Sequence, residues 1–297
     1  MPPVEHAVPG ADLRRLIDAA THALAAAGVP SPGHDARELA AFVLGVPQLI
    51  PAMPPPVPAD FAARYAAVVE RRARREPLQL ITGYAHFRHL RLRVQPGVFI
   101  PRPETEVVTE HAIEAARAVQ QRGRDPLVVD LCCGAGPIAL SVAREVPGAV
   151  VLAVDANPAA VELTRRNAHE LGLQVRAIHA DVRAADLLEE HRGRVDVVAA
   201  NPPYIPPGAQ PRQQEVRDHD PHLALYGGGP DGLDVPRAVI GAAARLLRPG
   251  GLLVMEHAEV QDERVRAAVV EADAFTGVRT ARDLADRPRM VLARRRG

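Results

Sequence analysis

The sequence predicts an α/β fold, in which a parallel sheet with helices on both faces follows a small all-α domain and a β-hairpin linker. Three observations support this prediction. Apolar residues recur at helical spacing before residue 80, apolar and polar residues alternate within 84–100, and strands alternate with Gly-rich turns and helices beyond Pro126. We therefore divide the chain into residues 1–83, 84–106 and 107–297.

The first 80 residues are predicted to form a small helical domain. Helical periodicity extends over 11–28, 34–45 and 60–76, and each stretch ends near Gly or Pro. The Pro-rich segment 51–58 separates two of these stretches and predicts a stiff connection. The arginine cluster at 71–75 is interpreted as a solvated helix face, with a ribosome- or RNA-facing role as the alternative.

A hairpin is predicted next, over residues 84–100, from the alternation in LRLRV and a turn at Pro96-Gly97. It leads into PRPETE at 101–106, where prolines flank Arg102 and two acidic residues follow.

Strands and helices then alternate to the end of the sheet. Helices are expected from about Ile138, from near Pro158 and over 235–247. The expected strands are LVVDL (127–131), VVLAVD (150–155), VRAIHAD (175–181), VDVVAAN (195–201) and GLLVMEH (251–257). Ligands bind at the carboxyl ends of strands in such sheets, so a site is expected at these ends.

The composition excludes several classes of protein. Basic and acidic residues balance at 36 each in a chain of 297 residues, so no global field favours nucleic acid or an anionic membrane. The only cysteines, Cys132 and Cys133, are neighbours, which excludes a disulfide framework. Without a signal pattern or an apolar run of membrane-spanning length, a soluble cytoplasmic protein is expected.

The first sheet strand ends in a Gly-rich loop, DLCCGAG at 130–136, and the second ends in Asp155. Small residues let a ligand approach the backbone, and an acid at this distance can accept hydrogen bonds from ribose hydroxyls. Such a loop also fits NAD, but the dinucleotide fingerprint requires glycines where this chain has Cys132 and Ala139. The form D-x-x-x-G-x-G instead resembles motif I of class I methyltransferases that use S-adenosylmethionine.

The motif NPPY, residues 201–204, follows the apolar run 195–200. Two prolines stiffen the chain as it leaves the strand. The side-chain oxygen of Asn201 and the carbonyl of Pro202 can then hold both N–H groups of an amide or aromatic amine, and Tyr204 can form a flat wall beside it. The alternative is a polyproline turn without chemistry.

NPPY is shared by methyltransferases of DNA amino groups, RNA guanine and protein glutamine, so the substrate must be inferred from other segments. Together the segments resemble the release-factor glutamine methyltransferases, the HemK/PrmC family. The matching stretches are PLQLITGYAHF (77–87), VFIPRPETEVV (98–108), AVDANPAAVELTRRNA (153–168), RDHDPHLALYGGGPDGLDVPRAVI (217–240) and LLRPGGLLVMEHAEVQ (246–261).

This resemblance implies a Rossmann-like methyltransferase domain at 107–297 and a helical substrate-recognition domain at 1–83. It implies methyl transfer from S-adenosylmethionine to the glutamine N5 in the GGQ motif of peptide chain release factors. A monomer is expected, because the sequence leaves no long apolar stripe over. The glutamine would contact Asn201, Pro202, Pro203 and Tyr204, of which Asn201, Pro202 and Tyr204 would be catalytic. The cofactor would contact Cys132, Cys133, Gly134, Ala135, Gly136, Asp155, Val182 and Asn201.

Two of these positions depart from the family's pattern. Cys132 replaces a usual glycine, and Val182 stands where an aromatic or bulky residue often lies against the adenine. We interpret the vicinal cysteines as inert packing residues, with redox sensitivity as the alternative.

Two polar clusters receive structural interpretations. Arg102 and Glu104 are expected to brace the cofactor pocket rather than to act as catalysts, because an amide needs no base here. His219, Asp220 and His222 have no spacing typical of zinc, so no metal is expected.

Two other functions stay open from the sequence. A nucleic-acid amino methyltransferase would share NPPY, although the neutral charge and the lack of a basic recognition insert argue against it. A non-catalytic module binding the ribosome or a release factor, with the cofactor as a structural ligand, would be consistent with Cys132 and Val182.

Overall fold

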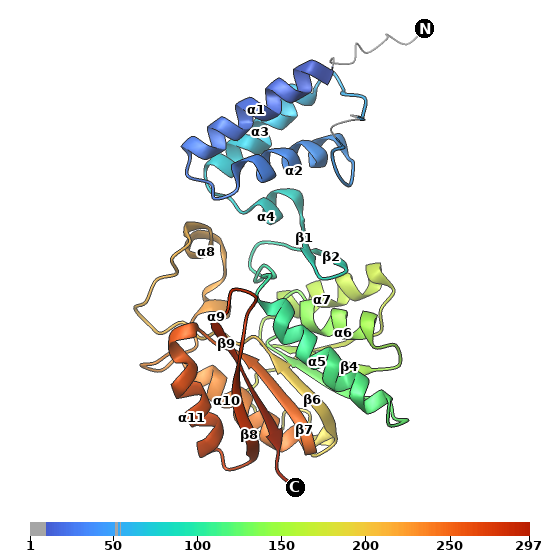
Figure 1. Ribbon diagram of the computed structural model, residues 1–297, viewed down its shortest axis with the longest axis vertical. Coiled ribbons are helices and arrows are strands. Elements are labelled where there is room, and N and C mark those ends of the chain that lie inside the picture. Colours follow the sequence, from blue (N-terminus) through green and yellow to red (C-terminus); the bar gives the residue numbers. More distant parts are fainter. Residues whose placement is uncertain (1–9, 51–52, 54) are drawn as a thin grey trace. The chain divides into compact units, whose positions relative to one another are not determined.

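The computed structural model describes residues 10–50, 53 and 55–297, which form two compact units (Figure 1). Unit 1 extends to Gly83 and also contains Gln213–His219, whereas unit 2 consists of Tyr84–Arg212 and Asp220–Gly297. The chain therefore passes between the units three times, and a segment that follows NPPY in sequence belongs to the helical unit.

Unit 1 is a small helical bundle. Its helices are α1 (Gly10–Ala26), α2 (Pro32–Leu44), α3 (Phe61–Ala73), α4 (Leu78–Thr82) and α8 (Gln214–His219). The three helices predicted from periodicity are thus confirmed, while the predicted stiff connection at 51–58 lies partly outside the described residues, at 51, 52 and 54. Leu24, Leu39 and Phe61 are fully buried in the core, and the buried Tyr65 hydroxyl donates to the Ala36 carbonyl at 2.8 Å.

The prediction that the arginine cluster at 71–75 is a solvated face is wrong for Arg72. Its side chain is buried, with Nε 2.7 Å from Asp35 Oδ2 and a terminal nitrogen 3.0 Å from Glu215 Oε1. Glu215 in α8 also accepts two hydrogen bonds from Arg75. The carboxylates that neutralise these arginines come from α2 and α8, far away in sequence, so the helical pattern of α3 alone could not reveal the burial.

The hairpin exists, but its turn is not where the sequence analysis placed it. Strands β1 (Tyr84–Phe87) and β2 (Leu90–Arg93) are joined at Arg88-His89, and Pro96-Gly97 lies beyond the hairpin. Arg88 adopts a left-handed φ of 49°. Its backbone N–H donates to Glu106 Oε1 at 2.9 Å, and its guanidinium binds Glu145 through two nitrogens at 2.7 and 2.9 Å. These bonds hold a turn that has no Gly or Asn to mark it in the sequence.

The sheet of unit 2 has seven strands in the order β5-β4-β3-β6-β7-β9-β8. The first five pair in parallel, and β9 is antiparallel to both of its neighbours. The strands are β3 (Leu127–Leu131), β4 (Val150–Asp155), β5 (Arg176–His179), β6 (Val195–Ala200), β7 (Leu247–Glu256), β8 (Phe275–Arg282) and β9 (Pro288–Arg295). All five strands expected from the sequence are confirmed, and the sheet is mainly parallel as predicted.

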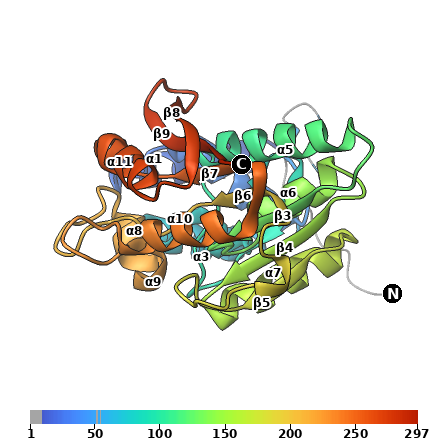
Figure 2. The ribbon, with the colours of Figure 1, turned by 90° about the horizontal axis from the view of Figure 1, so that it is seen from below.

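Helices cover both faces of this sheet. Alternate residues of one strand join different cores, so Val128 packs with α5, α6 and α7, and Val129 packs with α10 and α11. Figure 2 shows α5 and α10 on opposite sides of β6 and β7. The helices are α5 (Thr105–Gln120), α6 (Pro137–Glu145), α7 (Pro158–Leu171), α9 (His222–Leu225), α10 (Asp234–Leu246) and α11 (Asp262–Glu271), with short 3-10 turns at Glu189–His191 and Glu259–Gln261.

The sequence analysis identified neither α5 nor the antiparallel pair β8 and β9. Within the described part of the chain, no helix has both the length and the apolarity that a membrane span requires.

The buried ion pairs of unit 1 give a prediction about stability. Replacing Arg72 by Ala leaves the buried Asp35 without its ion-pair partner and removes one of the two arginines that bind Glu215, so we expect the free energy of unfolding to fall by about 3 kcal/mol. Arg74→Ala, at the C-cap of the same helix, is a matched control, because Arg74 and Glu70 are both exposed, and it should cost below about 0.5 kcal/mol. Urea denaturation at pH 7 measures both variants, and equal losses would contradict the assigned role of Arg72.

Candidate active site

A cavity opens at the carboxyl ends of β3, β4 and β6, within unit 2. It encloses about 1270 Å³ of space, including solvent at its mouth. The register of the sheet determines which residues lie together at this edge. Val154, Leu131, Ala200 and Met255 are aligned across β4, β3, β6 and β7. The residues that come next in the chain form a row at the sheet edge, which consists of Asp155, Cys132, Asn201 and Glu256. In this row Cys132 and Asn201 lie just beyond the ends of β3 and β6.

The loop after β3 is shaped by small residues. Cys132 has a left-handed φ of 63°, a conformation that favours glycine, at the position where the family's pattern has glycine. A Cβ placed on Gly134 would meet no atom closer than the Phe99 carbonyl at 3.9 Å, so the loop leaves room in front of this residue. At Gly136 a Cβ would lie only 2.9 Å from Thr164 Cγ2, so glycine there permits close packing of α7.

Asp155 ends β4 and holds the loop. Its Oδ2 accepts a hydrogen bond from the Gly134 N–H at 2.8 Å, and its Oδ1 accepts one from the Asn157 N–H at 2.8 Å. Burial raises the pKa of Asp155, and these backbone donors act in the opposite direction. Each carboxylate oxygen keeps a further lone pair, so the side chain can still accept from the hydroxyls of a ligand.

Asp130 is a fully buried carboxyl group beneath the same loop. Its Oδ2 accepts from the Ala139 N–H at 3.1 Å, and its Oδ1 has no hydrogen-bond partner among the described residues. Burial raises the pKa of Asp130 to about 8. The group thus anchors the start of α6 from below and does not line the cavity.

Both thiols of the loop are poor nucleophiles in this setting. Burial, reinforced by the negative charges of Asp155 and Asp130, raises the pKa of Cys132 and Cys133 well above its ordinary value. A neutral thiol is weakly reactive, which agrees with the interpretation of the pair as packing residues.

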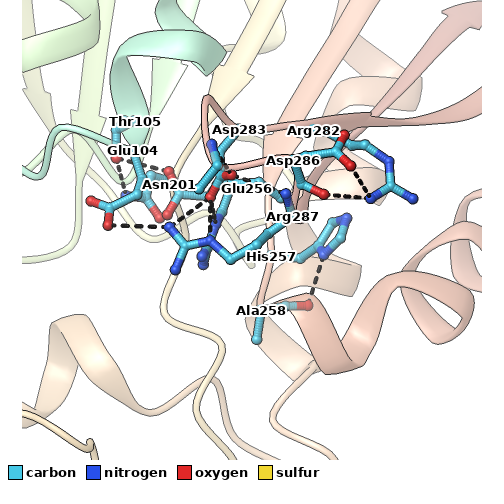
Figure 3. A network of polar contacts seen from close by, with 12 residues as sticks. Glu104, Thr105, Asn201, Glu256, His257, Ala258, Arg282, Asp283, Asp286 and Arg287 are labelled. Carbon is cyan, nitrogen blue, oxygen red and sulfur yellow. Dashed lines mark hydrogen bonds and ion pairs between the residues drawn. The ribbon is translucent and has the colours of Figure 1, made fainter.

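Asn201 is held by a short chain of hydrogen bonds (Figure 3). Its Nδ2 donates to Thr105 Oγ1 at 3.0 Å, and Thr105 Oγ1 donates to Glu256 Oε2 at 2.8 Å. Alternation along the strands explains this contact. Ala200 and Met255 pack in the core of the α10 face, so the following residues are directed toward the α5 face, where Thr105 starts α5.

The rest of NPPY is fixed through its backbone. Pro202 and Pro203 are buried. The Tyr204 carbonyl accepts from Gln261 Nε2 at 2.7 Å. The chain beyond it pairs with the end of α9, where the Ile205 N–H donates to the Leu225 carbonyl at 2.8 Å. The bend after β6 is therefore held on both sides.

The Tyr204 hydroxyl lies 3.5 Å from Glu256 Oε1. Burial raises the pKa of Tyr204, so the phenol stays protonated. Burial also raises the pKa of Glu256 to about 7, although the Thr105 hydroxyl and the charge of Arg289 act in the opposite direction. Glu256 is thus a buried carboxyl group that can change its charge near neutral pH.

The three charged residues of PRPETE each have a partner. Arg102 lines the cavity, forms an ion pair with Asp220 and lies over the Phe99 ring, 5.2 Å from its centroid. Glu104 faces Arg287 of the β8–β9 turn at 3.7 Å (Figure 3), and it does not line the cavity. Glu106 accepts a hydrogen bond from the Arg88 N–H in the hairpin turn.

The structure brings most of the predicted site residues together. Those lining the cavity are Cys132, Cys133, Gly134, Ala135, Asp155, Val182, Asn201 and Pro203. Gly136, Pro202 and Tyr204 do not line it. Gly136 packs against α7, and Tyr204 turns its hydroxyl toward Glu256.

The sequence analysis missed two residues next to Asn201. Thr105 stands between the two acidic residues of PRPETE, and no local pattern distinguishes it as a site residue. Glu256 was included in the strand GLLVMEH without a role. Its signal was present, because an acid at the carboxyl end of a strand beside the NPPY strand lies at the ligand-binding edge of a parallel sheet.

These residues fit S-adenosylmethionine. Gly134 leaves open space, Asp155 offers carboxylate lone pairs for hydroxyls, and the buried Val182 provides an apolar wall. Among the residues that the structure describes, no group of three or more His, Cys, Asp and Glu side chains could hold a metal ion.

Protein-family models match both the helical part and the sheet-containing part of the chain. The family described as "PrmC N-terminal domain" matches residues 15–83, and "Methyltransferase small domain" matches residues 90–215. The solved structure of the T. thermophilus 16S rRNA N2 G1207 methyltransferase, in complex with AdoMet and guanosine, has a TM-score of 0.50 and 24% identity. It covers 72% of this chain and 50% of that chain, and it supports the methyltransferase fold.

Curated relatives are closer in sequence. A release factor glutamine methyltransferase of Mycolicibacterium smegmatis is 48% identical over 284 residues, which cover 95% of this chain and 98% of that protein. A 4-amino-L-phenylalanine/4-methylamino-L-phenylalanine methyltransferase of Streptomyces pristinaespiralis is 43% identical over 254 residues, 84% of each chain. With the first relative matching nearly end to end and the helical domain matching as well, the chain belongs to the release factor glutamine methyltransferase family.

Proposed function

We propose that this protein transfers a methyl group from S-adenosylmethionine to the side-chain N5 of the glutamine in the GGQ motif of peptide chain release factors. The cofactor supplies a methyl group bound to a positively charged sulfur. In the reaction the glutamine nitrogen bonds to the methyl carbon while the bond between that carbon and the sulfur breaks, which leaves S-adenosylhomocysteine. The nitrogen then loses one of its two protons to water, which gives N5-methylglutamine.

The observation that carries this proposal is the fixed orientation of Asn201. Because its Nδ2 donates to Thr105, its Oδ1 remains as an acceptor at the sheet edge. A carboxamide nitrogen is a poor nucleophile, so the protein can accelerate the reaction mainly by holding the N–H groups and aiming the nitrogen. Asn201 Oδ1 and the Pro202 carbonyl are proposed to be the two acceptors, in agreement with the rigid Pro-Pro bend.

Acceptor oxygens also favour the transition state electrostatically. Positive charge grows on the nitrogen as it bonds to the methyl carbon, and carbonyl dipoles directed at the nitrogen stabilise that charge. Neither acceptor needs a shifted pKa. The ring of Tyr204 is proposed to contact the flat amide, with its hydroxyl held by Glu256.

The cofactor is proposed to bind along the loop 132–136. Gly134 leaves room for it, Asp155 accepts from its ribose hydroxyls, and Val182 packs against its adenine. Asn201, between this loop and Glu256 in the row at the sheet edge, is placed to contact the cofactor as well as the glutamine.

A protein substrate is favoured over the alternatives. The net charge is zero, which gives no general attraction to nucleic acid. The N-terminal helical unit, proposed to recognise the release factor, matches the PrmC N-terminal domain. We further propose that the protein acts as a monomer in the cytoplasm, where release factors are found.

Mass spectrometry of the GGQ peptide tests the proposed function. Purified protein, S-adenosylmethionine and an unmodified release factor should yield a peptide heavier by one methyl group, located on the glutamine. Parallel reactions contain ribosomal RNA or 4-amino-L-phenylalanine, the amine named for one relative. Methyl transfer to either of these, with none to the GGQ glutamine, would refute the proposal.

The acceptor role of Asn201 gives a kinetic prediction. Asn201→Ala removes one of the two oxygens that hold the amide, so the barrier should rise by about 2–4 kcal/mol, or roughly 30- to 1000-fold in kcat. Tyr204→Phe keeps the ring and loses only the long contact to Glu256, so it should stay within about fivefold of wild type. Single-turnover methylation with saturating cofactor measures both. An Asn201→Ala enzyme of near wild-type rate contradicts the role.

The carboxylate of Asp155 gives a binding prediction. Asp155→Asn places an amide donor against either the Gly134 or the Asn157 N–H, and it removes the charged acceptor for a hydroxyl. We expect the Kd for S-adenosylmethionine to rise by roughly 10- to 100-fold, measured by titration calorimetry. Asp186→Asn, at an exposed site away from the cavity, should leave the Kd unchanged. Equal affinities of wild type and Asp155→Asn would exclude this contact.

A further inference from the structure

The hydrogen bonds around Asn201 run in one direction. The Thr105 hydroxyl has a single proton, which it donates to Glu256 Oε2 at 2.8 Å. Only lone pairs of Thr105 Oγ1 then remain for Asn201, whose amide must turn its N–H group toward them, at 3.0 Å. The charge on Glu256 thus determines, through one hydroxyl, which end of the Asn201 amide is bound to the protein.

The opposite direction is chemically possible. If the group at 256 donated a hydrogen bond to Thr105, the threonine proton would be available to Asn201. The amide would then accept this proton with its oxygen and present N–H donors instead. Two N–H donors cannot hold the N–H groups of a substrate amide, so this second arrangement would be unproductive.

We propose that Thr105 and Glu256 are positioning residues whose hydrogen bonds fix Asn201 with its oxygen available to the substrate. This inference rests on the proposed function and adds two residues to it. Thr105 is 2% exposed and Glu256 is 3% exposed, so water does not compete freely for either bond. We call the hydrogen-bonded series Asn201, Thr105 and Glu256 the relay. All three residues lie in unit 2, so the relay is contained within the methyltransferase unit.

The surroundings of Glu256 make this relay sensitive to pH. It is faced by Thr105 of α5, Glu104 just before α5, Tyr204 of the bend and Arg289 of β9. Burial raises the pKa of Glu256 to about 7, against the opposing effects of Thr105 and Arg289. Burial raises the pKa of the neighbouring Tyr204, so the phenol keeps its proton while Glu256 changes charge. The relay operates above this pKa and is lost as the pH falls through it.

Removing the hydroxyl tests the relay directly. Thr105→Val keeps the branched shape and should lower kcat at least tenfold, with the Kd for S-adenosylmethionine within about twofold of wild type. Thr105→Ser retains the hydroxyl and should recover most of the rate. Thr109→Val is the matched control, because Thr109 lies one turn further along α5, is fully buried and donates only to the Thr105 carbonyl. It should leave kcat within about twofold.

The charge is tested by Glu256→Gln. Wild-type kcat should fall roughly tenfold between pH 8 and pH 6, as a group with a pKa near 7 takes up its proton. Glutamine can donate to Thr105 at every pH, so the variant should be slow throughout and nearly flat over this range. A wild-type profile that is flat, or a Glu256→Gln profile with the same fall as wild type, would overturn the role of Glu256.

A double-mutant cycle separates positioning from general damage. Once Asn201 is replaced by Ala, there is no amide to orient, so adding Thr105→Val should change kcat less than threefold. Additive losses, or equal losses in Thr105→Val and Thr109→Val, would overturn the proposal. Methylation of the GGQ glutamine by the wild-type enzyme is scored first. Failure at that step refutes the proposed function, whereas failure in the variants alone refutes the relay.

Discussion

The parallel pairing of β4, β3, β6 and β7 is the constraint on which the site depends. Parallel strands end at the same edge, and the register aligns one residue of each strand in a single row. Asp155, Cys132, Asn201 and Glu256 lie at least 23 positions apart in sequence. Each of them nevertheless directly follows a residue of the aligned row, in which neighbouring strands are about 5 Å apart. A shift of one residue in any pair would turn a side chain to the other face.

Burial then gives these polar groups their properties. A carboxylate at the end of a buried strand loses water, and the hydrogen bonds and charges around it compensate only in part. Asp155 accepts hydrogen bonds from two backbone N–H groups. Glu256 instead contacts the Thr105 hydroxyl and the Tyr204 phenol, and burial raises its pKa to about 7. The same edge of the sheet therefore contains one acid suited to bind hydroxyls and another suited to orient an amide.

Local patterns in the sequence were sufficient to predict much of the fold and part of the candidate site. The five parallel strands, three N-terminal helices and motifs at Asp155 and Asn201 are marked by periodicity and spacing. The features that the sequence analysis missed or misplaced depend on contacts between residues that are distant in the chain. The turn at Arg88 is held by acids of α5 and α6, the burial of Arg72 requires Glu215, and the contact between Thr105 and Glu256 joins residues 151 positions apart. No local pattern contains that information.

The placement of Gln213–His219 in the helical unit has a consequence for modularity. Because Glu215 neutralises Arg72 and Arg75, the helical unit is completed by a segment that the gene encodes between two parts of the methyltransferase unit. Cutting the chain at Gly83 would therefore separate Glu215 from Arg72 and Arg75, so both fragments would lose native contacts. In recombination among relatives, the helical unit and those seven residues would have to be inherited together, as a discontinuous cassette.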